Sequence, residues 1–279
     1  MASIPTSNPY GTLNNSAPVG GSDVANGQTE QQPLLGGLPA KKSSLKKRLA
    51  SDVQRDWADL VLLACYIITG LLDSASISTW GAFVSMQTGN TVYLGLGPTA
   101  QSNRWKKSGI SILSFCAGSF LFSRLHRHFS PSPKRRWILC LSFAVQTLFI
   151  VAAASIVTWG PKDAGPDDVP WYVIVPIALV AFQSCGQAVA SRALKYNALT
   201  SVVLTSIYCD LFSDAQLFEN LFTNAERNRR VAAPSLLLGG ALLGGLIAKS
   251  ALGTAGALWI AAVLKFLIVL AWVSWPAEE

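Results

Sequence analysis

The chain has 279 residues, of which 51% are hydrophobic and only 13% charged, and its formal net charge is +7. Soluble domains carry about 25% charged residues, so this deficit argues against an ordinary soluble domain and indicates an integral membrane protein. The five cysteines stand singly in apolar segments without a CxxC pair, which supports neither a disulfide framework nor a zinc site.

The first segment, residues 1–52, differs from the rest and is predicted to be a disordered cytosolic tail. It is rich in Gly, Ser, Asn, Pro and Gln, so it cannot bury enough apolar surface to offset its ordering entropy. It ends in the basic stretch KKSSLKKRLA, which suits anionic lipids of the cytosolic leaflet. Glu30, Leu34 and Leu35 resemble an acidic dileucine signal that a sorting adaptor would bind; the alternative is a plain spacer.

Residues 53–277 are predicted to form a membrane domain, an all-α polytopic bundle of six helices. A helix needs about 20 mostly apolar residues to cross the hydrocarbon core. Tryptophans at the ends of several apolar stretches fit an interfacial aromatic belt. The expected spans are residues 57–78, 108–123, 137–159, 171–190, 231–248 and 251–275.

The distribution of basic residues predicts that both termini face the cytosol. Of the 22 Lys and Arg residues, sixteen then fall in inner segments and five in outer ones, while Lys265 lies inside the last span. This bias follows the positive-inside rule. Arg104, Lys106 and Lys107 depart from it, because they lie on the outer side just before the second span.

The two halves of this domain, residues 57–159 and 171–275, resemble each other. Each opens on a tryptophan, and the polar stretch after Asp73 corresponds to the one after Gln187. Gln146 in the third span lies roughly opposite Lys265 in the sixth. Three crossings per half would invert the second half relative to the first, the architecture common in secondary transporters.

Two polar segments follow the first and fourth spans, MQTGNTVYLGLG and VVLTSIYCDLFSD. Irregular backbone at membrane depth is tolerated only where it is buried in protein or lines a wet cavity. We therefore predict re-entrant or broken half-helices that approach each other inside the bundle. Two alternatives stay open: amphipathic segments on opposite membrane faces, and an extra crossing by residues 74–103.

These segments resemble the YoaK-like membrane proteins, whose shared region is labelled domain of unknown function 1275. In that family a G-x-x-D-A-x-S segment precedes M-T-G-N-T-V, and later G-x-Q-N-A-A-S-R precedes V-L-T-G-x-x-x-D-L. The matching residues here are Gly70, Asp73, Ala75, Ser76, Thr88, Gly89, Asn90, Thr91, Val92, Gly186, Ala190, Ser191, Arg192, Thr205, Asp210 and Leu211.

The resemblance covers about residues 57–275 and has three departures. Gln87 interrupts the first block, Ser206 replaces a glycine, and Ala188 stands where the family has Asn, which weakens an amide-pair role for Gln187. The resemblance implies a multi-span membrane protein and no particular reaction, and the long tail suggests a fungal member.

Asp73 and Lys265 are the ionisable residues expected deepest in the membrane. A carboxylate inside a span costs several kcal/mol unless it is paired, protonated or hydrated, so Asp73 is a functional candidate, or else lies hydrated near the interface. Lys265 could pair with Asp73 or Asp210, or it could snorkel toward a membrane face, although the distance makes that strained. Asp210 and Asp214 lie four residues apart, on one face of a helix, and with Asp73 they could hold a cation, relay protons or simply cap a surface helix.

Other motifs are weaker. Gly240 and Gly244 fit the small-xxx-small pattern of helix packing. His126 and His128 lack the further ligands of a metal site. No cofactor motif and no catalytic triad is present, and basic residues that flank spans argue against nucleic-acid binding.

The leading functional hypothesis is a non-enzymatic permease for a small solute or ion, proton-coupled through Asp73, in the vacuolar or plasma membrane. The alternatives are a non-transporting membrane scaffold or regulator and an intramembrane lipid-modifying enzyme. Apart from the bilayer, the expected partners are this solute and the sorting adaptor. The residues expected along a substrate or ion path are Asp73, Gln87, Thr88, Gly89, Asn90, Gln187, Thr205, Asp210 and Lys265.

Overall fold

The computed structural model describes residues 47, 49–99, 101–128, 132, 134–165 and 167–278. Within these residues the protein is all-α, with eight α-helices, one short 3-10 helix and no β-strand beyond two isolated bridges. The all-α prediction is therefore confirmed for the described part of the chain. The sorting motif at Glu30, Leu34 and Leu35 lies outside it, as does most of the predicted tail.

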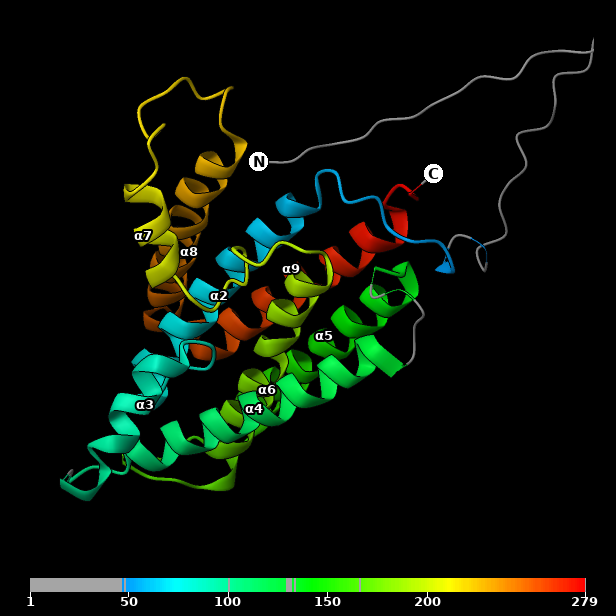
Figure 1. The fold of residues 1–279 in the computed structure, drawn as a ribbon. Coiled ribbons are helices and arrows are strands. Elements are labelled where there is room, and N and C mark those ends of the chain that lie inside the picture. The colour runs from blue at the N-terminus through cyan, green and yellow to red at the C-terminus, as the bar shows by residue number, and fades with distance from the viewer. Residues whose placement is uncertain are drawn as a thin grey trace, which may run out of the picture. The chain divides into compact units, whose positions relative to one another are not determined.

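Six helices are long and apolar enough to cross a membrane, which confirms the predicted count (Figure 1). At 1.5 Å rise per residue, 22 to 25 residues extend about 33–38 Å, which is sufficient for a hydrocarbon core of about 30 Å. The protein is thus a multi-pass membrane protein. The spans are α2 (Ala58–Trp80), α4 (Arg104–His128), α5 (Arg136–Trp159), α6 (Trp171–Ala193), α8 (Ala225–Lys249) and α9 (Gly253–Ser274).

The two polar segments form short helices instead of spans. They are α3 (Gln87–Gly95), which the 3-10 turn η1 (Gly97–Thr99) follows, and α7 (Thr205–Phe212). A helix of nine residues extends only about 14 Å, less than half of the hydrocarbon core. An extra crossing by residues 74–103 is therefore wrong: its first residues belong to α2, and the remainder breaks into loop and short helix.

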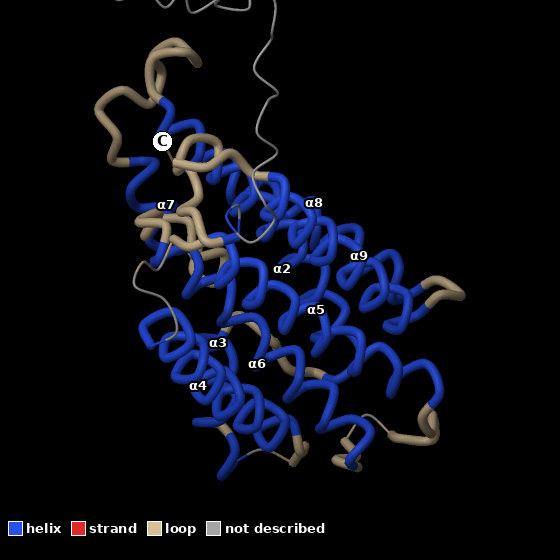
Figure 2. The backbone as a smooth tube through the Cα atoms, turned by 90° about the vertical axis from the view of Figure 1, so that its right-hand side faces the viewer, coloured by secondary structure: helices blue, strands red, loops and turns tan. Residues whose placement is uncertain are grey.

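Each helix packs mainly against helices of the other half of the chain or in a way that the other half repeats (Figures 1 and 2). In the most extensive contacts α2 lies against α8 and α4 lies against α6, while α5 lies against α9. Likewise α5 packs on α6 as α9 packs on α2, and α3 packs on α4 as α7 packs on α8. Replacing each helix by its counterpart in the other half reproduces the same pairs. Because each half contributes three spans, the predicted inverted repeat requires this pattern.

The inner segments meet at one end of the bundle. The backbone N–H of Val53 donates to the carbonyl of Lys134 at 3.1 Å, and that of Gln54 donates to the carbonyl of Pro276 at 3.1 Å. Arg229 in α8 pairs with Asp59 at the start of α2 at 2.6 Å. The segment before α2, the α4–α5 connection, the C-terminal residues and the start of α8 therefore share one side.

The opposite end gathers the segments that were predicted to face outward. The hydroxyls of Thr79 and Thr254 lie 2.5 Å apart, linking the end of α2 to the start of α9. The side chain of Asn103 donates to the carbonyl of Asp167 at 3.1 Å, which joins the α5–α6 connection to the segment before α4. The alternating arrangement of six crossings follows from these two ends.

Small residues let α2 and α8 approach closely. A Cβ added at Gly240 would lie 2.9 Å from the Cα of Ile67, and one added at Gly244 would lie 2.8 Å from the Cα of Leu71. Both glycines are buried in the contact. The predicted packing role of this pair is confirmed, because any side chain there would push the two backbones apart.

Candidate functional site

The first polar segment is re-entrant, because it turns back alongside the helix that it follows. Gly81 ends α2 with a φ of 75°, a left-handed conformation that favours glycine. The chain then returns to the level of Asp73, whose Oδ1 accepts from the backbone N–H of Val84 at 2.8 Å and of Ser85 at 2.9 Å. The Ser85 hydroxyl donates to Oδ2 of the same carboxylate. Asp73 is only 3% exposed, so it does not lie hydrated at an interface.

In the second half, the amide side chain of Gln187 makes the corresponding contact with the segment that follows its helix. Nε2 of Gln187 donates to the hydroxyl of Ser201 at 2.6 Å, in the connection that follows α6, and to Thr69 of α2 at 2.5 Å. Ser201 also adopts a positive φ of 60°. Asp73 and Gln187 therefore play the same part in the two halves: each holds the polar segment that follows its own helix.

The connections α2–α3 (residues 81–86) and α6–α7 (residues 194–204) are referred to here as the return loops. The block Thr88-Gly89-Asn90 holds the first of them. Asn90 is fully buried and its side chain bonds to both backbone polar groups of Phe83. Its Oδ1 accepts from the Phe83 N–H at 3.0 Å, and its Nδ2 donates to the Phe83 carbonyl at 2.7 Å. A Cβ at Gly89 would lie 2.8 Å from the Phe83 ring, so glycine permits this approach. Gln87 donates to Ser111 of α4 at 3.2 Å. The block thus fixes the geometry of the loop.

Lys265 lies at the centre of the bundle and is completely buried. Its Nζ donates to Oε1 of Gln146 at 2.5 Å and to Oε1 of Gln187 at 2.8 Å, and it lies 5.1 Å from the centre of the Phe143 ring. No ion pair of Lys265 occurs among the described residues. The predicted pairing with Asp73 or Asp210 is wrong, because two amide oxygens from α5 and α6 solvate the ammonium group and the Asp73 carboxylate is occupied by its loop.

The three aspartates do not come together as a cation site. Asp210 is exposed on α7, and α7 ends at Phe212, so Asp214 does not share a helix face with it. Asp214 instead accepts from Arg230 at 3.0 Å. The expected joint role of these aspartates with Asp73 is therefore wrong. Thr205, at the start of α7, is exposed as well.

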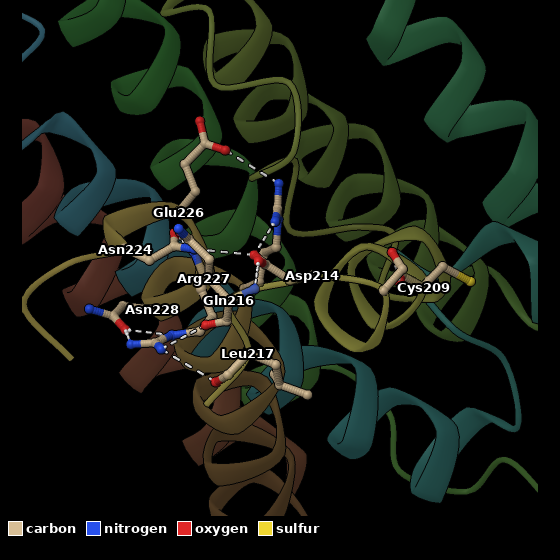
Figure 3. A network of polar contacts seen from close by, with 10 residues as sticks. Cys209, Asp214, Gln216, Leu217, Asn224, Glu226, Arg227 and Asn228 are labelled. Carbon is tan, nitrogen blue, oxygen red and sulfur yellow. Dashed lines mark hydrogen bonds and ion pairs between the residues drawn. The ribbon is translucent and has the colours of Figure 1, made fainter. Parts of the chain in front are cut away.

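Arg227 organises the connection between α7 and α8, and sequence reasoning gave it no role (Figure 3). Although only 3% exposed, it forms no ion pair within the described residues. Its guanidinium donates instead to the carbonyls of Gln216 at 3.1 Å, Leu217 at 3.3 Å, Glu219 at 2.5 Å and Asn220 at 3.0 Å. One side chain thereby fixes the backbone of a whole connection.

Both polar segments line one cavity of about 170 Å³, referred to here as the loop cavity. Thr88 contributes from the first segment and Val203 from the second, while α4 and α6 form the remaining walls. The predicted approach of the two segments is confirmed at their return loops, whereas α3 and α7 lie apart (Figure 1). The lining residues are Ser85, Gln87, Thr88, Phe115, Ser119, Cys185, Ala188, Arg192, Val202 and Val203.

The predicted path residues thus divide into three groups. Gln87 and Thr88 line the loop cavity, whereas Asp73, Gly89 and Asn90 shape the loop beside it. Gln187 and Lys265 form the buried node next to it, and Thr205 and Asp210 lie outside the cavity on α7.

Sequence reasoning missed the hydroxyl residues that bond these groups. Ser85, Ser111 and Ser201 accept or donate at the contacts described above, and Ser184 of α6 donates to the carbonyl of Val84 at 2.9 Å. The feature of the sequence that could have pointed to these residues is the recurrence of uncharged hydroxyl residues inside or beside apolar spans. That feature does not show which hydroxyl faces which partner.

Two further findings come from comparison with known proteins. No curated protein and no solved structure matches the chain. Residues 61–271 match a protein family described as "Protein of unknown function (DUF1275)", a region that includes the return loops, the loop cavity and the Lys265 node. Since the match covers well over half of the 279 residues, this multi-pass membrane protein belongs to the DUF1275 family.

Proposed function

We propose that the protein is a permease for a small solute or ion. One observation carries this proposal: two re-entrant segments from opposite halves of the chain line a common cavity against α4 and α6. Broken backbone inside a membrane domain is characteristic of substrate sites in transporters with inverted repeats. In the proposed mechanism the two halves move relative to each other around the loop cavity, and the protein performs no chemical reaction on the solute.

Asp73 holds the first loop in this mechanism. Both of its carboxylate oxygens accept hydrogen bonds from that loop, and Ser85, its partner, is the residue that faces the cavity. The structure therefore offers support for a positioning role of Asp73 and less for the proton-coupled role that the sequence suggested.

A second candidate function is a membrane scaffold or regulator that transports nothing. Its support is that Asn90, Gln187 and Lys265 each bond to other buried groups of the protein. Under this alternative the loop cavity is a packing feature. The two proposals differ in whether filling the cavity has any consequence beyond stability.

The orientation, the compartment and the finer affiliation remain proposals. The inner basic residues support cytosolic termini, in the vacuolar or plasma membrane, and a tag at residue 5 together with protease protection in sealed vesicles tests the orientation. Asn14 belongs to the sequon Asn14-Asn15-Ser16, which is not glycosylated in the cytosol, so glycosylation of Asn14 would reverse the proposed orientation. A YoaK-like affiliation, a fungal origin and adaptor binding at Glu30, Leu34 and Leu35 stay predictions.

Filling the loop cavity tests the permease. Thr88 lines the cavity and is exposed, so Thr88→Trp should block a path with little cost in stability. Thr91→Trp is the matched control, because Thr91 is exposed one turn further along α3 and does not line the cavity. Metabolite uptake is compared between cells with and without the protein, and then between the two variants.

The expected result is a solute whose uptake needs the protein, is lost in Thr88→Trp and persists in Thr91→Trp, with equal amounts of folded protein. An uptake profile that does not change with the protein would favour the scaffold. So would a Thr88→Trp variant that transports as well as the unmodified chain.

A further inference from the structure

A second cavity, of about 260 Å³, lies between α4 and α6 and is referred to here as the inner groove. Its lining residues are Ser123, His126, Arg127, Val189, Arg192 and Ala193. It shares Arg192 with the loop cavity. The residues of α4 continue from one cavity to the other, since Ser119 lines the loop cavity and Ser123, one turn later, lines the inner groove.

The shared wall places the inner groove between the loop cavity and the inner end of the bundle. α4 ends at His128 and α6 ends at Ala193, and both ends belong to the side where the inner segments meet. A solute that leaves the loop cavity along α4 and α6 therefore passes Arg192 first and Arg127 next.

The charges along this route have one sign. Arg127 and Arg192 are the residues with a formal charge at neutral pH among those that line the two cavities, and neither cavity is lined by an aspartate or glutamate. Beside the route, the buried Lys265 is a third cation, held by amide oxygens and not by a carboxylate. The nearby Asp73 is already saturated by Val84 and Ser85.

Two other arginines at the same end, Arg229 and Arg230, are neutralised by carboxylates. Arg229 pairs with Asp59 at 2.6 Å, and Arg230 pairs with Asp214 at 3.0 Å. Arg127 and Arg192 form no ion pair with the described residues, and Arg127 donates to the carbonyl of Ser123 at 3.3 Å. The inner groove is thus a place where guanidinium groups line a cavity without carboxylate partners.

We propose that the inner groove binds an oxyanion and that the transported solute is a small anion with a carboxylate or phosphate group. Guanidinium groups bind such groups through two parallel hydrogen bonds, which makes arginine the preferred side chain for them. Hydroxyl donors at Ser123 and Ser119 continue the recognition toward the loop cavity. This inference rests on the proposed permease, but the binding that it predicts can be measured without transport.

The loop cavity has a volume of about 170 Å³. A small anion such as inorganic phosphate or a short dicarboxylate fits this volume, and these two classes supply the probes.

Binding is tested on the full chain in nanodiscs of neutral phosphatidylcholine. The probes are inorganic phosphate and succinate, each compared with chloride at equal ionic strength, and the readouts are the thermal unfolding midpoint and the dissociation constant. We expect at least one probe to raise the midpoint. Arg192→Gln and Arg127→Gln should each weaken that binding by about tenfold or more, because each removes a charged hydrogen-bond donor.

The matched control is Arg124→Gln. Arg124 lies on the same helix, but it faces Phe120, 4.9 Å from the ring centre, and His128, and it does not line the inner groove. Its replacement changes the net charge equally and should leave anion binding unchanged. If Arg192→Gln does not fold, Arg192→Lys, which keeps the charge but loses the planar fork, should still show weaker binding.

A second arm distinguishes a solute from a lipid head group. In nanodiscs that contain phosphatidylglycerol and no added anion, the thermal unfolding midpoint should not rise as it does with the probe anion. Stabilisation by phosphatidylglycerol alone would overturn the proposal, because the arginines would then hold a lipid. Anion binding that survives in both Arg127→Gln and Arg192→Gln would overturn it too.

The outcomes separate this inference from the proposed function. Uptake of a cation or a neutral solute, with no binding of either probe, would support the proposed permease and overturn the proposal that its solute is an anion. Arginine-dependent anion binding without any uptake would preserve the oxyanion site and overturn the permease.

Discussion

Lys265 of α9 and Gln146 of α5 meet in the centre of the bundle, with 2.5 Å between Nζ and Oε1. They lie in helices that correspond in the two halves of the chain, and α5 packs directly on α9. The exchange of halves thus brings the amide of one half and the ammonium of the other to the same place. At this contact the repeat is symmetric in position and asymmetric in charge.

The first prediction concerns the coupling between Lys265 and its surroundings. Lys265→Met leaves two buried amide oxygens without their shared donor, which should lower the free energy of unfolding by about 1–3 kcal/mol for each of them. Combined with Asp73→Asn, the effects should add within about 0.5 kcal/mol, because the two residues share no hydrogen-bond partner in the described structure.

A double-mutant cycle of Gln187→Leu with Lys265→Met should behave differently from the cycle of Asp73→Asn with Lys265→Met. Gln187 contacts Lys265 directly, so its combination with Lys265→Met should deviate from additivity by about 0.5–3 kcal/mol. Denaturant unfolding in detergent measures both cycles. Strong coupling of Lys265 to Asp73, with rescue in the double variant, would mean that the two charges pair after all.

The second prediction concerns Asp73 alone. Asp73→Asn keeps an oxygen for the N–H groups of Val84 and Ser85, so it should cost only about 1–2 kcal/mol, the difference between charged and neutral hydrogen bonds. Asp73→Leu removes the acceptor from both buried N–H groups and should cost about 1–3 kcal/mol for each. The thermal unfolding midpoint in detergent ranks the two variants.

Transport separates the positioning role of Asp73 from an ionisable one. If Asp73 only holds the loop, Asp73→Asn should retain most of the uptake. A variant that unfolds normally and transports nothing would show that the carboxylate takes part in a proton or cation step.

The third prediction uses four neighbouring glycines of α8. Gly240→Ala and Gly244→Ala would place a Cβ against the backbone of α2 and should separate the two helices. Gly239→Ala and Gly245→Ala point into open space, so they should be neutral or stabilise the helix by about 0.5–1 kcal/mol. A comparison of the four unfolding midpoints checks this, and equal effects at all four sites would contradict the observed contact.

The fourth prediction concerns Arg227. Arg227→Gln removes donors to four backbone carbonyls in residues 216–220, so this connection should exchange its amide hydrogens faster while the amides of α2 remain protected. Arg230→Gln is the control, because Arg230 pairs with Asp214 and Glu226 side chains and not with these carbonyls. Unchanged exchange in residues 216–220 would show that Arg227 does not hold them.

The sequence predicted those features that depend only on length and composition. The six spans require about 20 apolar residues each, and α2, α5, α6 and α9 begin and end within about three residues of the expected limits. The exceptions are α4, which extends further at both ends, and α8, which begins at Ala225 and not at residue 231. The polar blocks after α2 and α6 predicted re-entrant loops for the same reason, since such backbone cannot face lipid.

The partners of the buried charges required three-dimensional information. Lys265 was expected to face a carboxylate because of its charge, but the rotation of α5 and α6 offers it Gln146 and Gln187 instead. Asp210 and Asp214 were expected on one helix face, but α7 ends between them. Neither the rotation of a helix nor its last residue follows from hydropathy, which reports only the average polarity of a segment.

The crossed packing of the halves has a consequence for biogenesis. α2 enters the membrane first, yet its main neighbour is α8, which is synthesised more than a hundred residues later. Until then α2 must carry Asp73 and Thr69 in lipid without the helices that later surround them. A chaperone that shields a newly inserted helix, or an early hairpin of Asp73 with its own return loop, would protect it during this interval. Of these two, the hairpin needs only residues 73–85, which leave the ribosome together.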